Sequence, residues 1–377
     1  MSRKICYITG TRADFGLMQS TLQAIHQSDD LALSIIVTGT HLAEHYGSTL
    51  DGIVAAGLPV SAKVAFDHGL PTGASMARNI GKMLVGFVDA LSDIKPDLVL
   101  LLGDRGEMLA GALAAIHLNI HVAHIHGGER SGTVDEPVRH AISKLSHFHF
   151  TATNNARDRL IRMGELTDKV FVTGAPGLDG LENLACVARN ALLTDMRLDV
   201  QAPVALMVYH PVLQEAGSAG NDAHQILNAL HARRIQVVAL KPNSDAGSDQ
   251  IRNVLETRAN DPGIRVVTHF PRERFISWMA AADLMIGNSS AGIIEAASFG
   301  TPVINIGSRQ NLRERNANVS DTPIDVTAIE SAITRALAHG PYTRQNIYGD
   351  GHASRRIVDL LKSVSLDSSG LAKANAY

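Results

Sequence analysis

Residues 98–107 read LVLLLGDRGE, and this stretch decides the fold class. Five apolar residues run without a break into Gly103, and Asp104 and Arg105 follow before a helical pattern begins. A strand with one solvent-exposed face would alternate apolar and polar residues. A continuous apolar run is instead typical of a strand in a parallel sheet whose two faces are both buried. The stretch therefore predicts a central strand, a polar turn and a helix, which is the repeating unit of an α/β fold.

The same unit recurs along the chain. In the first half, strands are expected at ICYIT, LSIIVTG, LVLLLG, HVAHIH, HFHFTAT and VFVTG, with helices at about 17–28, 76–94, 106–118, 136–145 and 154–163. After 176–203 the pattern restarts with VALMVYH, IQVVALK, IRVVTH, LMIGN and PVINIG, with helices near 222–233, 248–258, 272–282 and 291–299. We therefore expect two doubly wound parallel-sheet domains, residues 1–176 and 177–377, facing each other across a cleft.

The sequence pattern does not decide where the C-terminal helices pack. Helices expected near 327–339 and 352–363 either stay with the second domain or pack back on the first, because nothing in the sequence decides between the two. The tail DSSGLAKANAY is expected to fray.

The composition of the chain bears on the number of domains, the kind of binding partner and the cellular compartment. The 377 residues exceed the ~250–300 at which a single core stops growing, which favours two domains. A net charge of −3 gives no electrostatic reason to bind nucleic acid or an anionic membrane. Cys6 and Cys186 form no disulfide framework, the N-terminus lacks a signal peptide, and no apolar stretch approaches the ~18 residues of a membrane span. The expected location is the cytoplasm.

Polar motifs follow the predicted strands in both halves, at their carboxyl ends. They are TGTRADFG (9–16), GDRGE (103–107), HGGE (126–129), HP (210–211), KPNSD (241–245), GNSSAG (287–292) and GSRQ (307–310). Open parallel sheets bind their ligands at this edge. Arg12, Arg105 and Arg309 lie in these motifs, so we expect an anionic ligand between the two edges.

The motifs also restrict the kind of anion. No G-x-G-x-x-G follows the first strand and no G-x-x-x-x-G-K-[ST] occurs, so neither a dinucleotide fingerprint nor a P-loop is supported. In GNSSAG, Ser289, Ser290 and nearby backbone N–H groups suit a diphosphate and Glu295 suits a ribose diol, unless Ser289 only caps the helix. His210 precedes Pro211 at a strand end. Its position favours a role in acid–base chemistry or phosphate binding, and the alternative is a purely structural histidine.

Titratable residues crowd into residues 124–140, HIHGGERSGTVDEPVRH. Asp104, just upstream, is either a functional carboxylate or a cap for the helix that starts at Arg105. Asp135 is free for chemistry if Thr133 and Glu136 form the capping box of the next helix. Glu129 has no evident structural task, although a surface loop needs none.

The paired histidines raise the possibility of a metal site. His124 and His126 form one HxH pair, and His147 and His149 form another. Pairs on different strands need not converge, and no cysteine or H-x-x-x-H helix reinforces them. We therefore expect no metal.

Taken together, the motifs resemble the hydrolysing UDP-N-acetylglucosamine 2-epimerases of sialic acid biosynthesis, a bacterial type related to the epimerase domain of the human bifunctional enzyme. The matching segments run in order from near residue 5 to near residue 320 and are TGTRADFG, GDRGE, HIHGGERSGTVDEPVRHAISKLSHFHF, PNSDAGS and GNSSAGIIEAASFGTPVINIGSRQ. The resemblance implies the GT-B architecture, in which two Rossmann-like domains enclose a nucleotide-sugar cleft. It also implies a homodimer or a higher homo-oligomer.

The resemblance further implies a reaction and a site. UDP-N-acetylglucosamine and water would give N-acetylmannosamine and UDP, through elimination of UDP to a glycal and hydration of the glycal, with no cofactor. Asp104 and Asp135 would be catalytic carboxylates, and Arg139, one helical turn later, would pair with Asp135. The implied UDP-binding positions are Arg12, Arg105, His210, Asn243, Ser289, Ser290, Glu295 and Arg309.

One position departs from the family pattern. Several relatives read H-I-E-G-G-E, so His126 stands where they carry a catalytic glutamate. His126 itself, or Glu129 nearby, would take over that work, and His210 is a further acid–base candidate.

Other functions remain open from the sequence. A relative acting on UDP-2,4-diacetamido-2,4,6-trideoxyglucose in legionaminic acid biosynthesis would share every motif. A GT-B glycosyltransferase would share the fold but would need an acceptor groove. The glycosyltransferase also explains the crowding of titratable residues at 124–140 less well. A metal-dependent hydrolase would use the histidine pairs, and a non-catalytic UDP-sugar sensor would leave the acids without a task.

Overall fold

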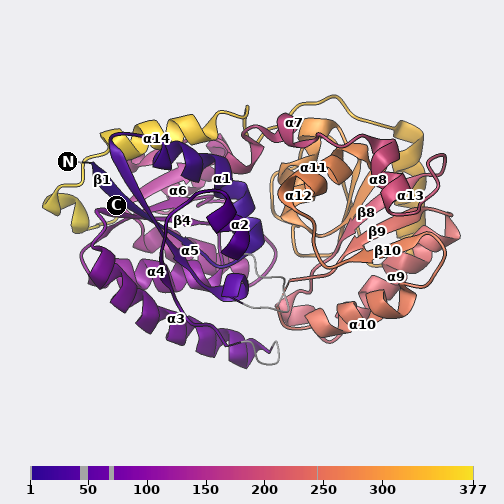
Figure 1. Ribbon diagram of the computed structural model, residues 1–377, viewed down its shortest axis with the longest axis horizontal. Coiled ribbons are helices and arrows are strands. Elements are labelled where there is room, and N and C mark those ends of the chain that lie inside the picture. Colours follow the sequence, from indigo (N-terminus) through magenta and orange to yellow (C-terminus); the bar gives the residue numbers. More distant parts are fainter. Residues whose placement is uncertain (1, 43–49, 68–71, 244, 377) are drawn as a thin grey trace.

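The computed structural model describes residues 2–42, 50–67, 72–243 and 245–376. Two lobes lie side by side (Figure 1), and each contains one parallel sheet flanked by helices. The strand orders are β3-β2-β1-β4-β5-β6-β7 in the first sheet and β10-β9-β8-β11-β12-β13 in the second. The expected pair of Rossmann-like doubly wound domains is therefore confirmed.

The first lobe contains the strands β1 (Arg3–Thr9), β2 (Leu31–Val37), β3 (Val60–Lys63), β4 (Leu98–Leu102), β5 (His121–Ile125), β6 (Phe148–Thr151) and β7 (Val170–Val172). Its helices are α1 (Arg12–His26), α2 (Leu50–Ala55), α3 (Gly73–Ile94), α4 (Gly106–His117), α5 (Asp135–Leu145) and α6 (Asn154–Arg162). Helix α1 starts earlier than the apolar pattern predicted, because Thr11 and Asp14 form a capping box at its N-terminus.

The second lobe contains the strands β8 (Val204–Val208), β9 (Gln236–Leu240), β10 (Ile264–Val267), β11 (Leu284–Gly287), β12 (Val303–Ile306) and β13 (Val319–Thr322). Its helices are α7 (Leu181–Leu184), α8 (Arg189–Asp195), α9 (Ala219–Ala232), α10 (Ser248–Arg258), α11 (Arg272–Ala281), α12 (Ser290–Ile294) and α13 (Val326–His339). The single helix expected at 291–299 is divided into α12 and a 3-10 turn at Ala296–Phe299. Within the described ranges, no helix combines the length and apolar character needed to cross a bilayer.

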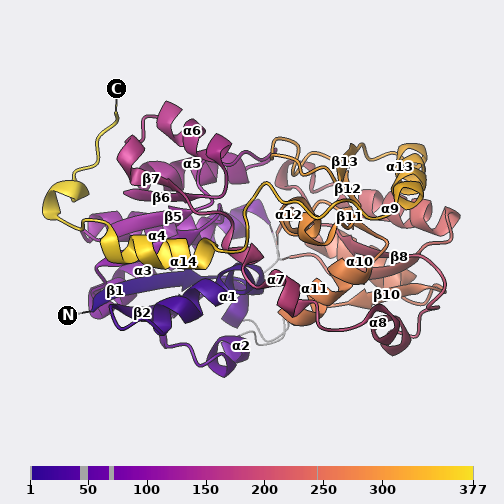
Figure 2. The ribbon, with the colours of Figure 1, turned by 90° about the horizontal axis from the view of Figure 1, so that it is seen from above.

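The last helix, α14 (Ala353–Ser363), crosses back to the first lobe. Ile357 and Leu361 belong to the apolar core that contains Met18 and Leu22 of α1, and Figure 2 shows α14 beside α1. Helix α13 instead packs in the core of the second lobe through Ile329 and Ile333. Of the two expected C-terminal helices, one therefore packs on each domain.

The chain after α14 is also held in place, and the expected fraying of the tail is wrong for the described residues. A 3-10 turn forms at Ser368–Leu371. Nζ of Lys373 then donates to the carbonyl oxygen of Ser143 at 2.9 Å and pairs with Glu165 at 2.6 Å. The domain boundary at 176/177 stays a prediction, and it falls between β7 and β8.

The strand order fixes where a ligand is to be sought. The connections reverse direction between β1 and β4 in the first sheet, and between β8 and β11 in the second. Ligands of open α/β sheets bind at the carboxyl ends of the strands beside such a reversal. Arg12, Asp104 and His210, which were expected at the site, follow β1, β4 and β8, and Asn288 of the motif GNSSAG follows β11.

Candidate active site

The second lobe presents His210 and Asn288 at adjacent strand ends. The backbone N–H of His210 donates to Oδ1 of Asn288 at 2.7 Å, and Nδ2 of Asn288 donates to the carbonyl oxygen of His210 at 2.8 Å. Nδ1 of His210 accepts from the backbone N–H of Asn243 at 3.3 Å. Burial, and then the charge of Arg309, lower the pKa of His210, so the ring is neutral at pH 7. Its hydrogen therefore lies on Nε2, which is left to donate to an anion.

Other residues that were expected to contact the phosphates or the ribose interact with neighbouring residues of this lobe. Ser289 does cap α12, because its Oγ accepts from the backbone N–H of Ala291 at 3.3 Å. Nη1 of Arg309 donates to the carbonyl oxygen of Asn288 at 3.1 Å. The buried carboxylate of Glu295 pairs with Arg272, a contact that the sequence did not predict.

In the first lobe, Arg105 precedes α4 and is fixed by two carboxylates. Its Nε donates to Oε1 of Glu107 at 2.7 Å, and its Nη2 lies 3.5 Å from Oδ1 of Asp245 in the second lobe. The charge of Glu107, with a further contribution from Asp245, raises the pKa of Arg105 although burial lowers it. Neither carboxylate was predicted, although Asp245 lies in the motif KPNSD, whose position at a strand end was the available signal.

Arg12 opens α1 and lies near the second lobe. Burial, and then the charge of Arg12, lower the pKa of His269, which follows β10. The expected role of Arg12 toward an anion stays a prediction.

Asp104 follows β4 and is held by arginines. Nη2 of Arg139 donates to its Oδ2, and Nη2 of Arg313 lies 3.8 Å from the same oxygen. The prediction that Asp104 caps α4 is wrong, because Arg105 holds the cap position and makes no side-chain cap bond. The predicted pair of Arg139 with Asp135 is also wrong: Arg139 has no exposed surface and points inward to Asp104.

Asp135 begins α5 and faces the other lobe. Its Oδ2 lies 4.0 Å from Nη2 of Arg309. The expected capping box of Thr133 and Glu136 does not form, because Val134 holds the cap position of α5 and makes no side-chain cap bond. Oγ1 of Thr133 instead accepts from the N–H of Asp135 at 3.2 Å, and Oε2 of Glu136 accepts from the backbone N–H of Ser131 at 2.9 Å. The carboxylate of Asp135 is thus not used as a cap, as the functional interpretation requires.

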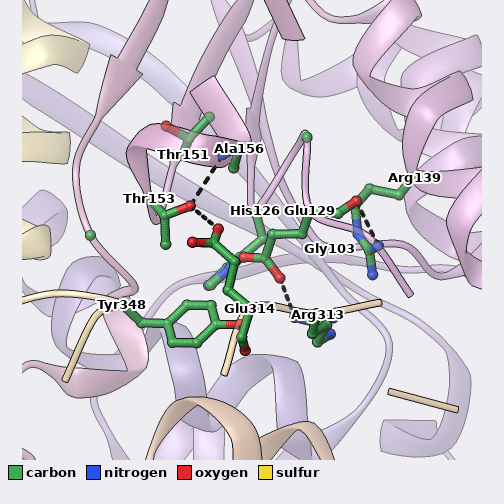
Figure 3. Close-up of polar contacts among 12 residues, drawn as sticks. Gly103, His126, Glu129, Arg139, Thr151, Thr153, Ala156, Arg313, Glu314 and Tyr348 are labelled. Atoms are coloured by element: carbon green, nitrogen blue, oxygen red, sulfur yellow. Dashed lines mark hydrogen bonds and ion pairs between the residues drawn. The ribbon is translucent and has the colours of Figure 1, made fainter. Parts of the chain in front are cut away.

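His126 and Glu129 form a buried pair after β5 (Figure 3). His126 has φ 64°, a left-handed conformation that is uncommon for residues other than glycine, although Asn, Asp and His adopt it more often than the rest. Nδ1 of His126 donates to Oε1 of Glu129. Only 4% of the surface of Glu129 is exposed, so the interpretation of this residue as part of a surface loop is wrong. Burial raises the pKa of Glu129, but the charges of His126 and Arg313 bring it below its ordinary value. An ionised Glu129 only accepts, so Nε2 of His126 is the ring nitrogen left for proton exchange.

The remaining histidines of the HxH pairs have structural partners. His124 contacts Ser143 Oγ through Nδ1 at 3.0 Å and the carbonyl oxygen of Gly103 through Nε2 at 2.6 Å. Nδ1 of His147 accepts from Val122, and His149 pairs with Glu165 at 2.9 Å. Among the described residues, no three or more His, Cys, Asp or Glu side chains are grouped to hold a metal ion.

These residues from the two lobes meet at one interdomain site. Among the described residues, four ion pairs cross between the lobes: Arg105–Asp245 at 3.5 Å, Arg309–Asp135 at 4.0 Å, Arg313–Asp104 at 3.8 Å and the buried pair Arg313–Glu129. The backbones also approach closely, since a Cβ on Gly132 would lie 2.1 Å from the carbonyl oxygen of Ser308. Arg313 was missed from the sequence; its signal was the charged run RER, a few residues after the motif GSRQ.

Comparison with known proteins shows the family of the chain. A family model described as UDP-N-acetylglucosamine 2-epimerase matches residues 23–362. The chain is 48% identical over 377 residues to UDP-N,N'-diacetylbacillosamine 2-epimerase (hydrolyzing) of Legionella pneumophila, covering 100% of both chains. It is 35% identical over 358 residues to UDP-N-acetylglucosamine 2-epimerase of Neisseria meningitidis, covering 93% of this chain and 92% of the relative.

The fold has solved counterparts as well. It is similar to that of UDP-GlcNAc 2-epimerase from Neisseria meningitidis bound to UDP-GlcNAc, with a TM-score of 0.79, 20% identity and coverage of 95% of this chain and 99% of that one. The GT-B-like arrangement expected from the motifs is therefore confirmed. The chain belongs to the UDP-N-acetylglucosamine 2-epimerase family, as the resemblance of its motifs to the hydrolysing members implied.

Proposed function

We propose that the protein is a hydrolysing 2-epimerase of UDP-2,4-diacetamido-2,4,6-trideoxyglucose, the sugar also called N,N'-diacetylbacillosamine. The products are 2,4-diacetamido-2,4,6-trideoxymannose and UDP. Identity of 48% over the full length of a relative named for this sugar supports the choice. UDP-N-acetylglucosamine, the first expectation from the motifs, is the second candidate, supported by the relative at 35% identity.

The reaction determines which groups the site must supply. A base takes the proton from C2, the C1–O bond breaks, and its electron pair leaves with the diphosphate of UDP, which gives a glycal. Water then adds its hydroxyl to C1, and a proton enters C2 on the opposite face. Acid–base groups are needed on both faces of the ring, together with cations at the diphosphate.

One observation carries the proposal: the acid–base groups of the first lobe lie within ion-pair reach of cations from the second. Asp135 is 4.0 Å from Arg309, and Asp104 is 3.8 Å from Arg313. A sugar placed between the lobes would contact Asp104, Asp135 and His126. The diphosphate would replace the carboxylates now paired with Arg105 and Arg309.

Product analysis tests the function. We expect NMR in D2O to show free 2-epimerised sugar and UDP with no acceptor present, and deuterium at C2 of the product. Rates with the two UDP-sugars should favour the diacetamido substrate, and treatment with a chelator should leave them unchanged. A need for an acceptor would instead indicate a glycosyltransferase, and a product without deuterium would exclude the elimination route.

Binding of UDP should depend on the second lobe. Arg309→Ala and Ser290→Ala are each expected to weaken UDP binding about tenfold to a hundredfold, because each loses a charged or polar contact worth ~1.5–3 kcal/mol from a partly desolvated site. Isothermal titration calorimetry measures the effect. Arg274→Ala is the control, since this arginine pairs with Asp195 away from the site. Unchanged affinity in both site variants would remove the UDP assignment from this lobe.

A further inference from the structure

A short segment of the second lobe, residues 313–316, contacts the first lobe through two adjacent side chains of opposite charge. Arg313 pairs with Oε2 of Glu129 through Nη1, and its Nη2 lies 3.8 Å from Oδ2 of Asp104. The exposed fractions of the side chains are 9% for Arg313 and 3% for Glu129. A buried guanidinium from one lobe thus holds two carboxylates of the other.

Glu314 fixes the same segment independently. Its carboxylate accepts from Oγ1 of Thr153 (Figure 3). It also accepts from Nδ2 of Asn155 at 2.8 Å. Thr153 caps α6, so the carboxylate lies at the positive end of that helix. The hydroxyl of Tyr348 donates to the carbonyl oxygen of Glu314 at 2.9 Å. The residue that follows Arg313 is therefore fixed by contacts of its own, which limits where Arg313 can lie.

We propose that Arg313 is a positioning residue supplied by the second lobe, which completes the His126–Glu129 pair and aligns Asp104 when the two lobes are together. The proposal rests on the proposed function, because it assigns Arg313 a part in the same chemistry. Arg313 would act through Glu129 and Asp104 and would not itself exchange protons. The reactive arrangement would then exist only when the lobes are closed, so the acid–base groups are assembled only while substrate is enclosed between them.

The charges around Glu129 show why one arginine matters. The titratable and charged groups near it are Asp104, His124, His126, Arg139, Arg313, Glu314 and Tyr348. Arg139 donates to the backbone carbonyl oxygen of Glu129 at 3.2 Å, whereas Arg313 pairs with its carboxylate. Without Arg313, burial would raise the pKa of Glu129, and a protonated Glu129 would lose capacity to accept from His126.

The test compares Arg313→Gln with Arg258→Gln. Arg258 is also a mostly buried arginine of the second lobe, but its guanidinium pairs with Asp261 and donates to Oδ1 of Asn228 at 3.0 Å, within that lobe, so it is a matched control. In Arg313→Gln we expect kcat at pH 7 to fall about tenfold to a hundredfold, UDP affinity to change less than about threefold, and the acid limb of the kcat–pH profile to move about one unit to higher pH. Arg258→Gln should match the wild type in all three.

Arg313→Lys separates charge from geometry. Lysine keeps the charge but has no planar fork to hold two carboxylates, so we expect a partial loss of kcat with the acid limb unmoved. If Arg313→Gln does not fold, this variant decides the matter, and a wild-type kcat would overturn the proposal. A loss of kcat in Arg313→Gln with an unmoved acid limb, or an equal loss in Arg258→Gln, would also overturn it.

A second measurement does not depend on the substrate. The ¹⁵N chemical shifts of the His126 ring, followed against pH, report when Glu129 takes up a proton. The transition assigned to Glu129 should move to higher pH in Arg313→Gln, and an unmoved transition would overturn the proposal. If the wild type converts neither UDP-sugar, the proposed function fails, and this titration still tests the role of Arg313.

Discussion

His126→Asn is expected to lower kcat by ~10²–10⁴, the usual contribution of a positioned acid or base, with little change in the melting temperature. His126 has φ 64°, and asparagine is one of the few side chains that accept this backbone conformation at low cost. The variant therefore keeps the turn after β5 while it removes Nε2 from the site. It separates the chemistry of the imidazole from the structural demand of the position.

Turnover of the preferred UDP-sugar and thermal unfolding measure the two effects. His117→Asn is the control, because His117 is exposed at the end of α4 and bonds only locally, with its Nδ1 2.8 Å from the carbonyl oxygen of Leu113. A nearly normal kcat in His126→Asn would transfer the acid–base role to another group. A large fall in melting temperature would show that the imidazole is mainly structural.

The central strands were predictable from the sequence because their signal is local. The run 98–102 is buried throughout, as its unbroken apolar character indicated. The edge strands β3 and β13 were missed because VSAK and VSDT are only partly buried and contain no apolar run. Their formation depends on pairing with β2 and β12, which no short stretch of sequence encodes.

The positions of the site residues could also be predicted, but their pairing could not. Asp104, Arg105 and Arg309 were expected at strand ends, where the ligand edge of a parallel sheet lies, and the structure places them there. The helical spacing favoured a pair between Arg139 and Asp135, because residues four apart lie on neighbouring turns. Arg139 instead points into the core toward Asp104, a contact that depends on how α5 packs on the end of β4.

Contacts between the lobes were the least predictable part. Arg313 with Glu129 and Arg105 with Asp245 join residues far apart in the chain, and they require the two domains to be oriented first. Charge alone did not single out these partners, because the sequence contains 34 basic and 37 acidic residues.

Asp104→Asn and Asp135→Asn should both lower kcat by ~10²–10⁴, but only the first should reduce stability. Asp104 accepts from Arg139, which has no exposed surface, so the neutral variant leaves a buried guanidinium without its counter-charge. Breaking such a pair costs about 2–5 kcal/mol. Asp135 has a side chain 34% exposed and a single cation at 4.0 Å, so its contribution to stability should be small.

UDP binding provides the third comparison between these two variants. Both aspartates lie in the first lobe, so the affinity for UDP should fall in neither. In Asp135→Asn it should stay the same or rise slightly, because the charge that competes for Arg309 is removed. Calorimetry with UDP, thermal unfolding and kcat measured on the same preparations give the full pattern. Normal turnover in both variants would remove these carboxylates from the mechanism, and a larger stability loss in Asp135→Asn would contradict the pairing of Asp104 with Arg139.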